Sequence, residues 1–197
     1  MKTTLKNEYN KIKLFGKNLC IKVIVGDYEN ENDLLDAIAI ELEKGVQFFQ
    51  LNQGECGDKI FLELSQKVQQ LLSMYDATFV IKGSLAVSYF LKPDGVLLDN
   101  NDIDFGRVRE LLGETIIIGY ECVEKDDIDI AIKRGADYLI VSTPSSSTKN
   151  VVIEYAKWVY ENVNNTPVFL EVDSVEMRTK LDSIKIDKHL LLINQHK

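Results

Sequence analysis

One pattern repeats along most of this sequence: a short run rich in Val, Ile and Phe, then a turn, then a longer segment with helical periodicity. The apolar runs predict eight strands, at residues 19–25, 46–51, 77–81, 95–98, 115–118, 138–141, 168–171 and 190–193. The segments between them predict seven helices, at residues 32–44, 59–74, 84–91, 104–112, 124–134, 149–162 and 175–181. Because the runs are continuously apolar, we expect a parallel sheet that is covered on both faces.

Eight strand-and-helix units favour an α/β fold of the (β/α)₈ TIM-barrel type. The rival architecture, an open doubly wound sheet, usually has five or six strands and would leave two units over. The chain is short for a barrel, which typically has about 250 residues, and the eighth helix is missing. We expect an extra N-terminal flanking helix within residues 1–18, where Leu5, Tyr9 and Ile12 have amphipathic spacing, and one barrel domain over residues 19–197.

Composition excludes several classes of partner. The formal net charge is -8, which repels polyanions, so we expect no nucleic-acid partner. No apolar run approaches the ~18 residues of a membrane span, so we expect no membrane partner. The three cysteines lack C-x-x-C spacing and indicate thiols in a reducing compartment, hence a cytoplasmic protein. A homo-oligomer is compatible with all of this, and a partner chain could cover the place of the missing helix.

Barrel proteins carry their chemistry where strands end and helices begin. Lys82 is predicted at the end of the third strand. One interpretation is a structural ion pair between its ammonium and Asp102 across the mouth of the barrel, which is the end where the strands finish. The other is an amine nucleophile whose pKa is lowered by burial. Asp99, Asp102 and Asp104 suggest a cation site, although Asp99 and Asp104 also suit a turn and a helix N-cap.

Two further groups of residues have alternative interpretations. Six hydroxyl residues within 142–148 precede a predicted helix that starts near Lys149, which indicates either an anion site or a mobile loop. Cys56 and Cys122 lie in predicted strand-end loops, either as thiols in the mouth or as ordinary thiols. Tyr155 and Trp158 are predicted to pack within the sixth long helix.

Five segments together resemble the thiamine phosphate synthase and TenI family: Glu43–Leu51, Gly95–Asp102, Ile117–Gly119, Gly135–Tyr138 and Thr148–Lys149. They occur in register between about Cys20 and Pro167. The resemblance implies a (β/α)₈ fold and a transferase. Such an enzyme couples hydroxymethylpyrimidine diphosphate with thiazole phosphate, with Mg²⁺ assistance, to give thiamine phosphate and diphosphate.

The resemblance also implies site residues, although it assigns no catalytic one. Asp102 matches a metal ligand, which makes Mg²⁺ a possible cofactor, and a phosphorylated small molecule is the implied partner. Gln50, Thr148 and Lys149 match substrate-binding residues of the family. Asn52, Lys82 and Glu121 occupy further substrate-binding positions with other residue types, and we count all six as candidate substrate-binding residues.

The departures of this sequence from the family pattern agree with one another: cations and phosphate-binding glycines are lost, and acids are gained. Where the family has Gln-Leu-Arg-x-Lys after the second strand, this chain has Gln50-Leu51-Asn52-Gln53-Gly54, without either cation. Lys82-Gly83 replaces an Asn-Asp pair, Glu121 replaces a serine, and Val172-Asp173 replaces a phosphate-binding Gly-Gly. Our alternative is therefore a catalytically degenerate member that binds a metabolite or has a regulatory role.

Overall fold

The structure is a computed structural model, which describes residues 21–25, 30–99, 104–142, 149–163, 166–172 and 190–192. Its strands are β1 (Ile21–Val25), β2 (Phe48–Asn52), β3 (Thr78–Lys82), β4 (Gly95–Leu98), β5 (Ile117–Cys122), β6 (Tyr138–Val141), β7 (Val168–Val172) and β8 (Leu190–Leu192). Its helices are α2 (Glu31–Glu43), α3 (Asp58–Ser73), α4 (Leu85–Leu91), α5 (Phe105–Leu112), α6 (Lys125–Arg134) and α7 (Lys149–Asn162).

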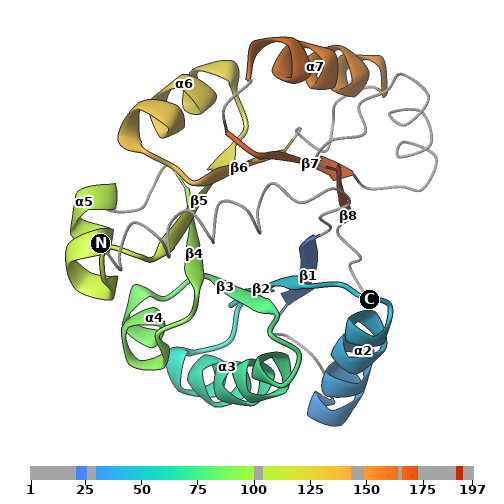
Figure 1. The fold of residues 1–197 in the computed structure, drawn as a ribbon, viewed down its shortest axis with the longest axis vertical. Coiled ribbons are helices and arrows are strands. Elements are labelled where there is room, and N and C mark those ends of the chain that lie inside the picture. The colour runs from blue at the N-terminus through green and yellow to red at the C-terminus, as the bar shows by residue number, and fades with distance from the viewer. Residues whose placement is uncertain are drawn as a thin grey trace.

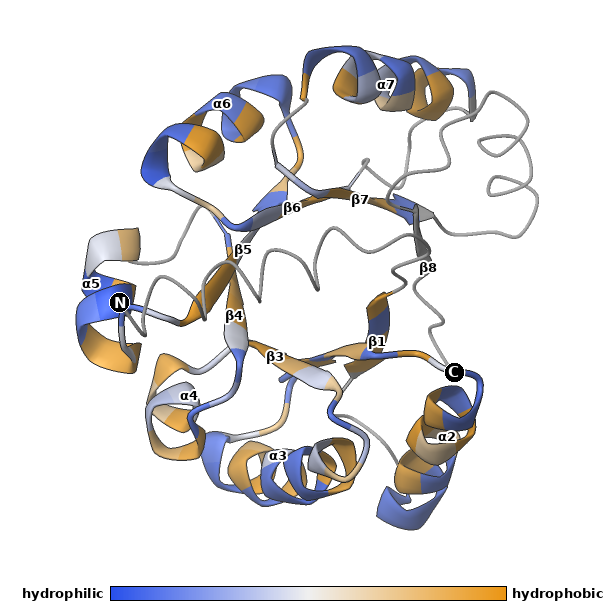
Figure 2. Ribbon diagram, in the orientation of Figure 1, coloured by the Kyte–Doolittle hydropathy of each residue, from blue (hydrophilic) through white to orange (hydrophobic). Residues whose placement is uncertain are grey.

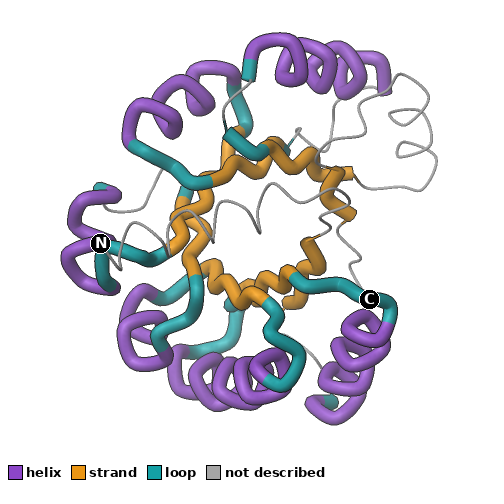
Figure 3. Tube along the Cα trace, in the orientation of Figure 1, coloured by secondary structure: helices purple, strands orange, loops and turns teal. Residues whose placement is uncertain are grey.

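The strands form one parallel sheet in the order β1 to β8, which is also their order along the chain. A doubly wound sheet reverses its strand order at a switch point, so this topology rules that alternative out. Viewed end-on, the strands trace a ring with the helices outside it, and β8 comes back beside β1 (Figures 1 and 3). The fold is therefore TIM-barrel-like.

The predicted strands and helices match the observed ones to within two residues at each end, except at the end of β5. Tyr120, Glu121 and Cys122 were predicted in a loop but belong to that strand. Strand conformation is favoured there because Tyr120 and Cys122 are buried beneath the helices, while Glu121 lies on the opposite face. The predicted helices within residues 1–18 and at 175–181 lie outside the described residues.

The apolar side chains form an outer and an inner layer. Alternate strand residues such as Phe49, Leu51 and Tyr120 pack against the helices. The inner layer fills the ring and consists of Ile21, Val23, Phe48, Val80, Leu97, Ile117, Tyr138, Ile140 and Phe169. Figure 2 shows that the outer helices carry both apolar and hydrophilic residues, as amphipathic helices do. No helix in the described ranges is long and apolar enough to span a membrane.

The predicted helix ends are confirmed where the structure describes them. Gly45 and Gly135 follow α2 and α6 with φ of 87° and 85°, the left-handed conformation that ends many helices. Asp104 is the N-cap of α5, because its Oδ1 accepts a hydrogen bond from the Gly106 amide at 2.8 Å. Its role as a cap explains why the sequence places an acid there.

Two aspartates at the amino ends of strands hold neighbouring strands in register. Asp94, just before β4, accepts a hydrogen bond from the Phe79 amide of β3 at 2.9 Å. Asp137, just before β6, accepts one from the Ile118 amide of β5 at 2.9 Å, and it pairs with Arg109 at 3.1 Å. The same kind of hydrogen bond, from a strand amide to the aspartate before the next strand, thus fixes the β3–β4 and β5–β6 pairs.

Inside the ring, Gly119 leaves room for the ring of Tyr138 on the next strand. A Cβ atom at position 119 would lie 2.1 Å from Tyr138 Cζ and 2.5 Å from its Oη. The Tyr138 side chain is fully buried between Phe48 and Phe169, so it has nowhere to move.

We predict that Gly119→Ala lowers the free energy of unfolding by about 1–3 kcal/mol or more, because it overpacks the barrel interior. Urea unfolding measures this value. Tyr138→Leu is the compensating variant: in that background the added methyl group should cost less, a non-additive result. Equal costs in both backgrounds would show that the two positions do not compete for space.

Candidate functional site

Polar side chains gather on the inner face of the ring at the carboxyl ends of the strands. Each lies two residues beyond a position inside the ring, so strand alternation directs it inward. We call this group the mouth network: Asn52 of β2, Lys82 of β3, Glu121 of β5, Ser142 directly after β6, and Glu171 of β7. These five residues come from five units of the barrel, and they meet at the end where TIM-barrel proteins carry their active sites.

Four of the five residues, all except Asn52, form a chain of polar contacts. The Lys82 ammonium forms a salt bridge with Oε2 of Glu121. Ser142 Oγ lies 3.3 Å from Oε1 of Glu121 and also contacts Oε2 of Glu171. The side chains of Lys82 and Glu121 are 30% and 22% exposed, so this pair is partly shielded from water. The contacts therefore connect β3 to β7 across the mouth.

Gln50 lies below this network on the inner face of β2. It is 2% exposed, and its Nε2 donates a hydrogen bond to Asn52 Oδ1 at 2.7 Å. Its other amide atom, Oε1, is buried without a hydrogen-bond partner among the described residues. A buried acceptor without a donor costs about 1–3 kcal/mol, which a bound donor would recover.

The structure brings together four of the predicted site residues, as the pairs Gln50–Asn52 and Lys82–Glu121. Thr148 and Asp102 lie outside the described residues. Lys149 is the first residue of α7, and its side chain also lies outside them. Lys82 was expected either to pair with Asp102 or to act as a nucleophile. Its observed partner is Glu121, which favours the ion pair with a different carboxylate.

Sequence reasoning missed Glu171 and treated Ser142 only as part of a hydroxyl-rich loop. A signal for both was present. Glu171 and Ser142 stand two residues beyond Phe169 and Ile140, which fill the ring, so period-two alternation directs both polar side chains into the mouth. An acid at the last inward position of a buried strand is unusual enough to mark it as a candidate.

Other residues named in the sequence analysis have structural roles. Gln53, in the segment that takes the place of the family's Gln-Leu-Arg-x-Lys, connects two loops, because its Oε1 accepts a hydrogen bond from the Ser84 amide at 2.8 Å and its Nε2 donates to Asp58 at 2.9 Å. The rings of Tyr155 and Trp158 stack at 6.3 Å against the outer core, as predicted.

Cys122 does not reach the mouth, contrary to one of the two interpretations of this thiol. It is fully buried in the outer layer between the sheet and the helices. Desolvation by burial, with a smaller contribution from Asp127, raises the pKa of its thiol to about 12. The thiol therefore stays protonated and unreactive near neutral pH.

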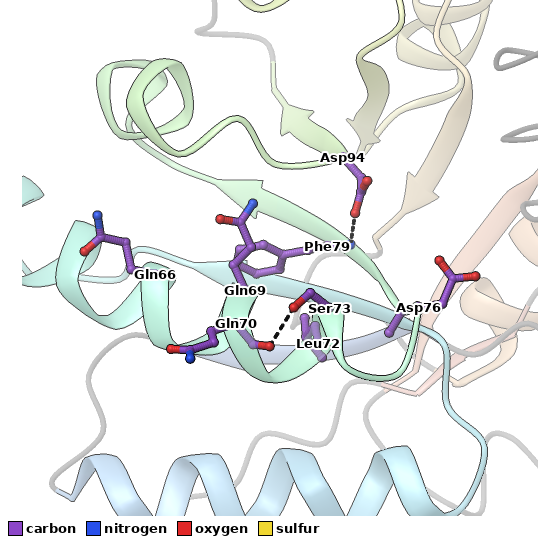
Figure 4. A pocket seen from close by; sticks show the side chains of 9 residues that line it. Gln66, Gln69, Gln70, Leu72, Ser73, Asp76, Phe79 and Asp94 are labelled. Atoms are coloured by element: carbon purple, nitrogen blue, oxygen red, sulfur yellow. Dashed lines mark hydrogen bonds between the residues drawn. The ribbon is translucent and has the colours of Figure 1, made fainter.

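A cavity of about 490 Å³ lies at the opposite end of the sheet, where β3 and β4 begin (Figure 4). Gln66, Gln69, Gln70, Asp76 and Asp94 supply most of its polar lining. Figure 4 shows Asp94 bonded to the Phe79 amide and Ser73 to the Gln70 carbonyl, so both side chains serve the fold. We place the candidate site at the mouth, because the amino-terminal face of such barrels serves stability.

The part of the mouth that the structure describes contains no ready-made cluster of metal ligands. Within the described ranges, no three His, Cys, Asp or Glu side chains lie close enough to hold a metal ion. Lys82, at the end of β3, adds a positive charge to the mouth. Mg²⁺ binding through Asp102 stays a prediction from the resemblance.

We predict that the Lys82–Glu121 pair is coupled energetically, because both side chains are mostly shielded from solvent. In a double-mutant cycle with Lys82→Met and Glu121→Gln, we expect a coupling energy of about 1 kcal/mol or more from urea unfolding. The matched control is the exposed Lys67–Glu31 pair at 2.6 Å, which we expect to contribute about 0–0.5 kcal/mol. Equal coupling in both pairs would contradict a special role for the mouth pair.

We also predict that a thiol reagent at pH 8 labels Cys122 only after unfolding, because its thiol is buried and protonated. Cys56, which is partly exposed, provides the comparison within the same molecule. Peptide mass spectrometry after timed labelling distinguishes the two sites. Labelling of Cys122 as fast as Cys56 in the folded protein would show that its burial is transient.

Comparison with known proteins assigns most of this chain to a family. The family described as thiamine monophosphate synthase matches residues 21–170, which contain the strands from β1 to the middle of β7. A thiamine-phosphate synthase of Prochlorococcus marinus is 34% identical over 60% of this chain and 34% of its own length. One of Clostridioides difficile is 25% identical over 88% of this chain and 86% of its own.

Solved structures agree on the fold. The thiamine phosphate pyrophosphorylase of Pyrococcus furiosus superposes with a TM-score of 0.69 at 21% identity, over 96% of this chain and 87% of that one. A 3-dehydroquinate dehydratase of Geobacillus kaustophilus has a TM-score of 0.67 at 10% identity, over 92% of this chain and 85% of that one. The chain spans only about a third of the length of the Prochlorococcus relative. The family match covers most of the described barrel, and the chain belongs to the thiamine monophosphate synthase family.

Proposed function

We propose that this protein is a divergent thiamine phosphate synthase-like transferase that acts at the mouth of the barrel. The family match carries the proposal, since residues 21–170 include the ends of β2, β3 and β5, which hold Asn52, Lys82 and Glu121. The proposed reaction couples hydroxymethylpyrimidine diphosphate with thiazole phosphate and releases diphosphate.

The described residues suggest how the substrates would be held. Gln50 and Asn52 present amide groups on β2 that can orient a heterocycle by hydrogen bonds. We propose that Thr148 and Lys149, at the start of α7, contact phosphate oxygens, since a helix N-terminus and an ammonium both favour anions. Asp102 remains the proposed ligand for Mg²⁺.

A second candidate function is metabolite binding without turnover. The observation that favours it is the pairing of Lys82 with Glu121. The charge of the one lysine or arginine that the described strands direct into the mouth is thereby already neutralised, which weakens its attraction for a diphosphate. A regulatory or binding protein could keep such a mouth.

The proposal also includes the closure and bounds of the barrel domain and the cellular location of the protein. We propose one closed (β/α)₈ barrel domain over residues 19–197 with a flanking helix at residues 1–18; the position of β8 beside β1 supports closure. We propose a cytoplasmic location, because the described Cys56 and Cys122 are both thiols.

The proposed reaction predicts turnover when the full chain is given both phosphorylated substrates and Mg²⁺. Lys149→Met should lower kcat/KM by about tenfold or more, because it removes a charge-assisted contact to phosphate. Lys157→Met, on an exposed position of the same helix, is the matched control and should leave kcat/KM unchanged.

Binding measurements separate the two candidate functions. A thermal shift with either substrate but no turnover would contradict the transferase and support the binding protein. The absence of both turnover and a thermal shift would contradict both candidates.

A further inference from the structure

Three side chains at the carboxyl ends of β2 and β3 connect the second and third units of the barrel. Gln53 directly follows β2, Asp58 is the first residue of α3, and Ser84 is the N-cap of α4. Gln53 Oε1 accepts a hydrogen bond from the Ser84 amide at 2.8 Å, and its Nε2 donates to Asp58 Oδ1 at 2.9 Å. Ser84 Oγ donates to Asp58 Oδ2 at 3.0 Å, which closes the ring of contacts. We call these three residues the Gln53 cluster.

Both ends of the Gln53 amide have partners. Besides its bond to Asp58, Nε2 also donates to the Cys56 carbonyl at 3.0 Å. The partners fix the orientation of the amide, because Ser84 presents a donor whereas Asp58 and Cys56 present acceptors. The position therefore requires a side chain that accepts at one atom and donates at the other.

The Gln53 cluster is joined through the backbone to two residues of the mouth network. Asn52 and Lys82 are paired in register at the ends of β2 and β3, and the Gln53 amide extends this pairing by donating to the Lys82 carbonyl at 2.9 Å. Gly83 lies between Lys82 and Ser84 with φ of 135°, a conformation that favours glycine. Because glycine is so permissive, the backbone after Lys82 is well defined only if Ser84 is held.

Close packing strengthens this restraint. A Cβ atom at position 83 would lie 2.6 Å from Gln53 Cβ and 2.7 Å from Gln53 Oε1, so the two loops touch at this point. Lys82 forms its salt bridge with Glu121 across the ring, two strands away. A shift of the turn at Gly83 moves the base of the Lys82 side chain relative to Glu121.

We propose that Gln53 is a positioning residue for the mouth, which holds the β2–α3 and β3–α4 loops together and thereby keeps Asn52 and Lys82 in place. This role rests on the proposed function at the mouth. Gln53 acts through the backbone of its neighbours, so its contribution to turnover is indirect. A displacement of about 1 Å in an active site can cost about a hundredfold in rate, so loop contacts of this kind affect turnover strongly.

Two substitutions at position 53 break the cluster in different ways. Gln53→Glu keeps the acceptor for the Ser84 amide but places a carboxylate against Asp58, where a donor is needed. Gln53→Met removes all the hydrogen bonds of the amide at similar volume. Asp58→Asn added to Gln53→Glu restores the contact with donor and acceptor exchanged, at the net charge of the unaltered chain. In Gln53→Met the same Asp58→Asn change finds no acceptor, so it is the matched control for rescue.

Activity is measured on the full chain with both phosphorylated substrates and Mg²⁺. We expect Gln53→Glu and Gln53→Met each to lower kcat/KM by about tenfold. Asp58→Asn should return kcat/KM to within about threefold of the unaltered value in the Gln53→Glu background, and should restore nothing in Gln53→Met. Gln70→Glu, the same chemical change at an exposed position of α3, should leave kcat/KM unchanged.

The coupling between Lys82 and Glu121 provides a measurement that does not depend on turnover. We expect the double-mutant cycle with Lys82→Met and Glu121→Gln to lose about half of its coupling or more in the Gln53→Glu background. The coupling should return when Asp58→Asn is added. Thermal unfolding checks that each variant is folded, and if Gln53→Glu does not fold, Gln53→Met decides by the same two measurements.

The results distinguish the positioning role from the proposed reaction. Unchanged kcat/KM and unchanged coupling in the folded variants at position 53 would overturn the role, as would a folded Gln53→Glu variant that Asp58→Asn does not rescue. Either result in a chain that turns over its substrates leaves the transferase intact. In a chain without turnover, loss of the coupling in Gln53→Glu and its return with Asp58→Asn would support the role and reject the transferase.

Discussion

The alternation of side chains along buried parallel strands is the constraint on which the rest of this structure depends. The strands from β1 to β7 have helices on one side and the interior of the ring on the other, so both faces must be apolar along most of their length. Polar groups can enter the ring only at its ends, where water reaches them. Gln50, which lies one step deeper than Asn52, and Tyr138 are exceptions, because Gln50 Oε1 and Tyr138 Oη are buried without a hydrogen-bond partner among the described residues.

This constraint explains why the fold could be predicted in such detail. The apolar runs at 95–98 and 138–141 coincide with β4 and β6, because nothing in them competes with strand formation. The end of β5 was the main error. The predicted strand ended before Gly119, but burial of Tyr120 and Cys122 in the outer layer extends it through Cys122.

The site was less predictable, because a sequence does not show which side chains pair with each other. Strand position placed Asn52, Lys82 and Glu121 at the mouth, and the family resemblance added Gln50. Neither source could pair Lys82 with Glu121, because β3 and β5 are separated by β4 in the sheet and the contact crosses the ring. Glu171 was missed because an acid inside an apolar run was taken as part of the strand.

The aspartates before β4 and β6 have a further consequence for how such a barrel can change. Asp94 and Asp137 fix strand register at the amino ends, far from the mouth. Alignment of neighbouring strands at β3–β4 and β5–β6 therefore does not rely on the side chains at the carboxyl ends. A lineage can exchange cations for acids at the mouth while the barrel keeps its alignment, so selectivity and folding are subject to separate selection.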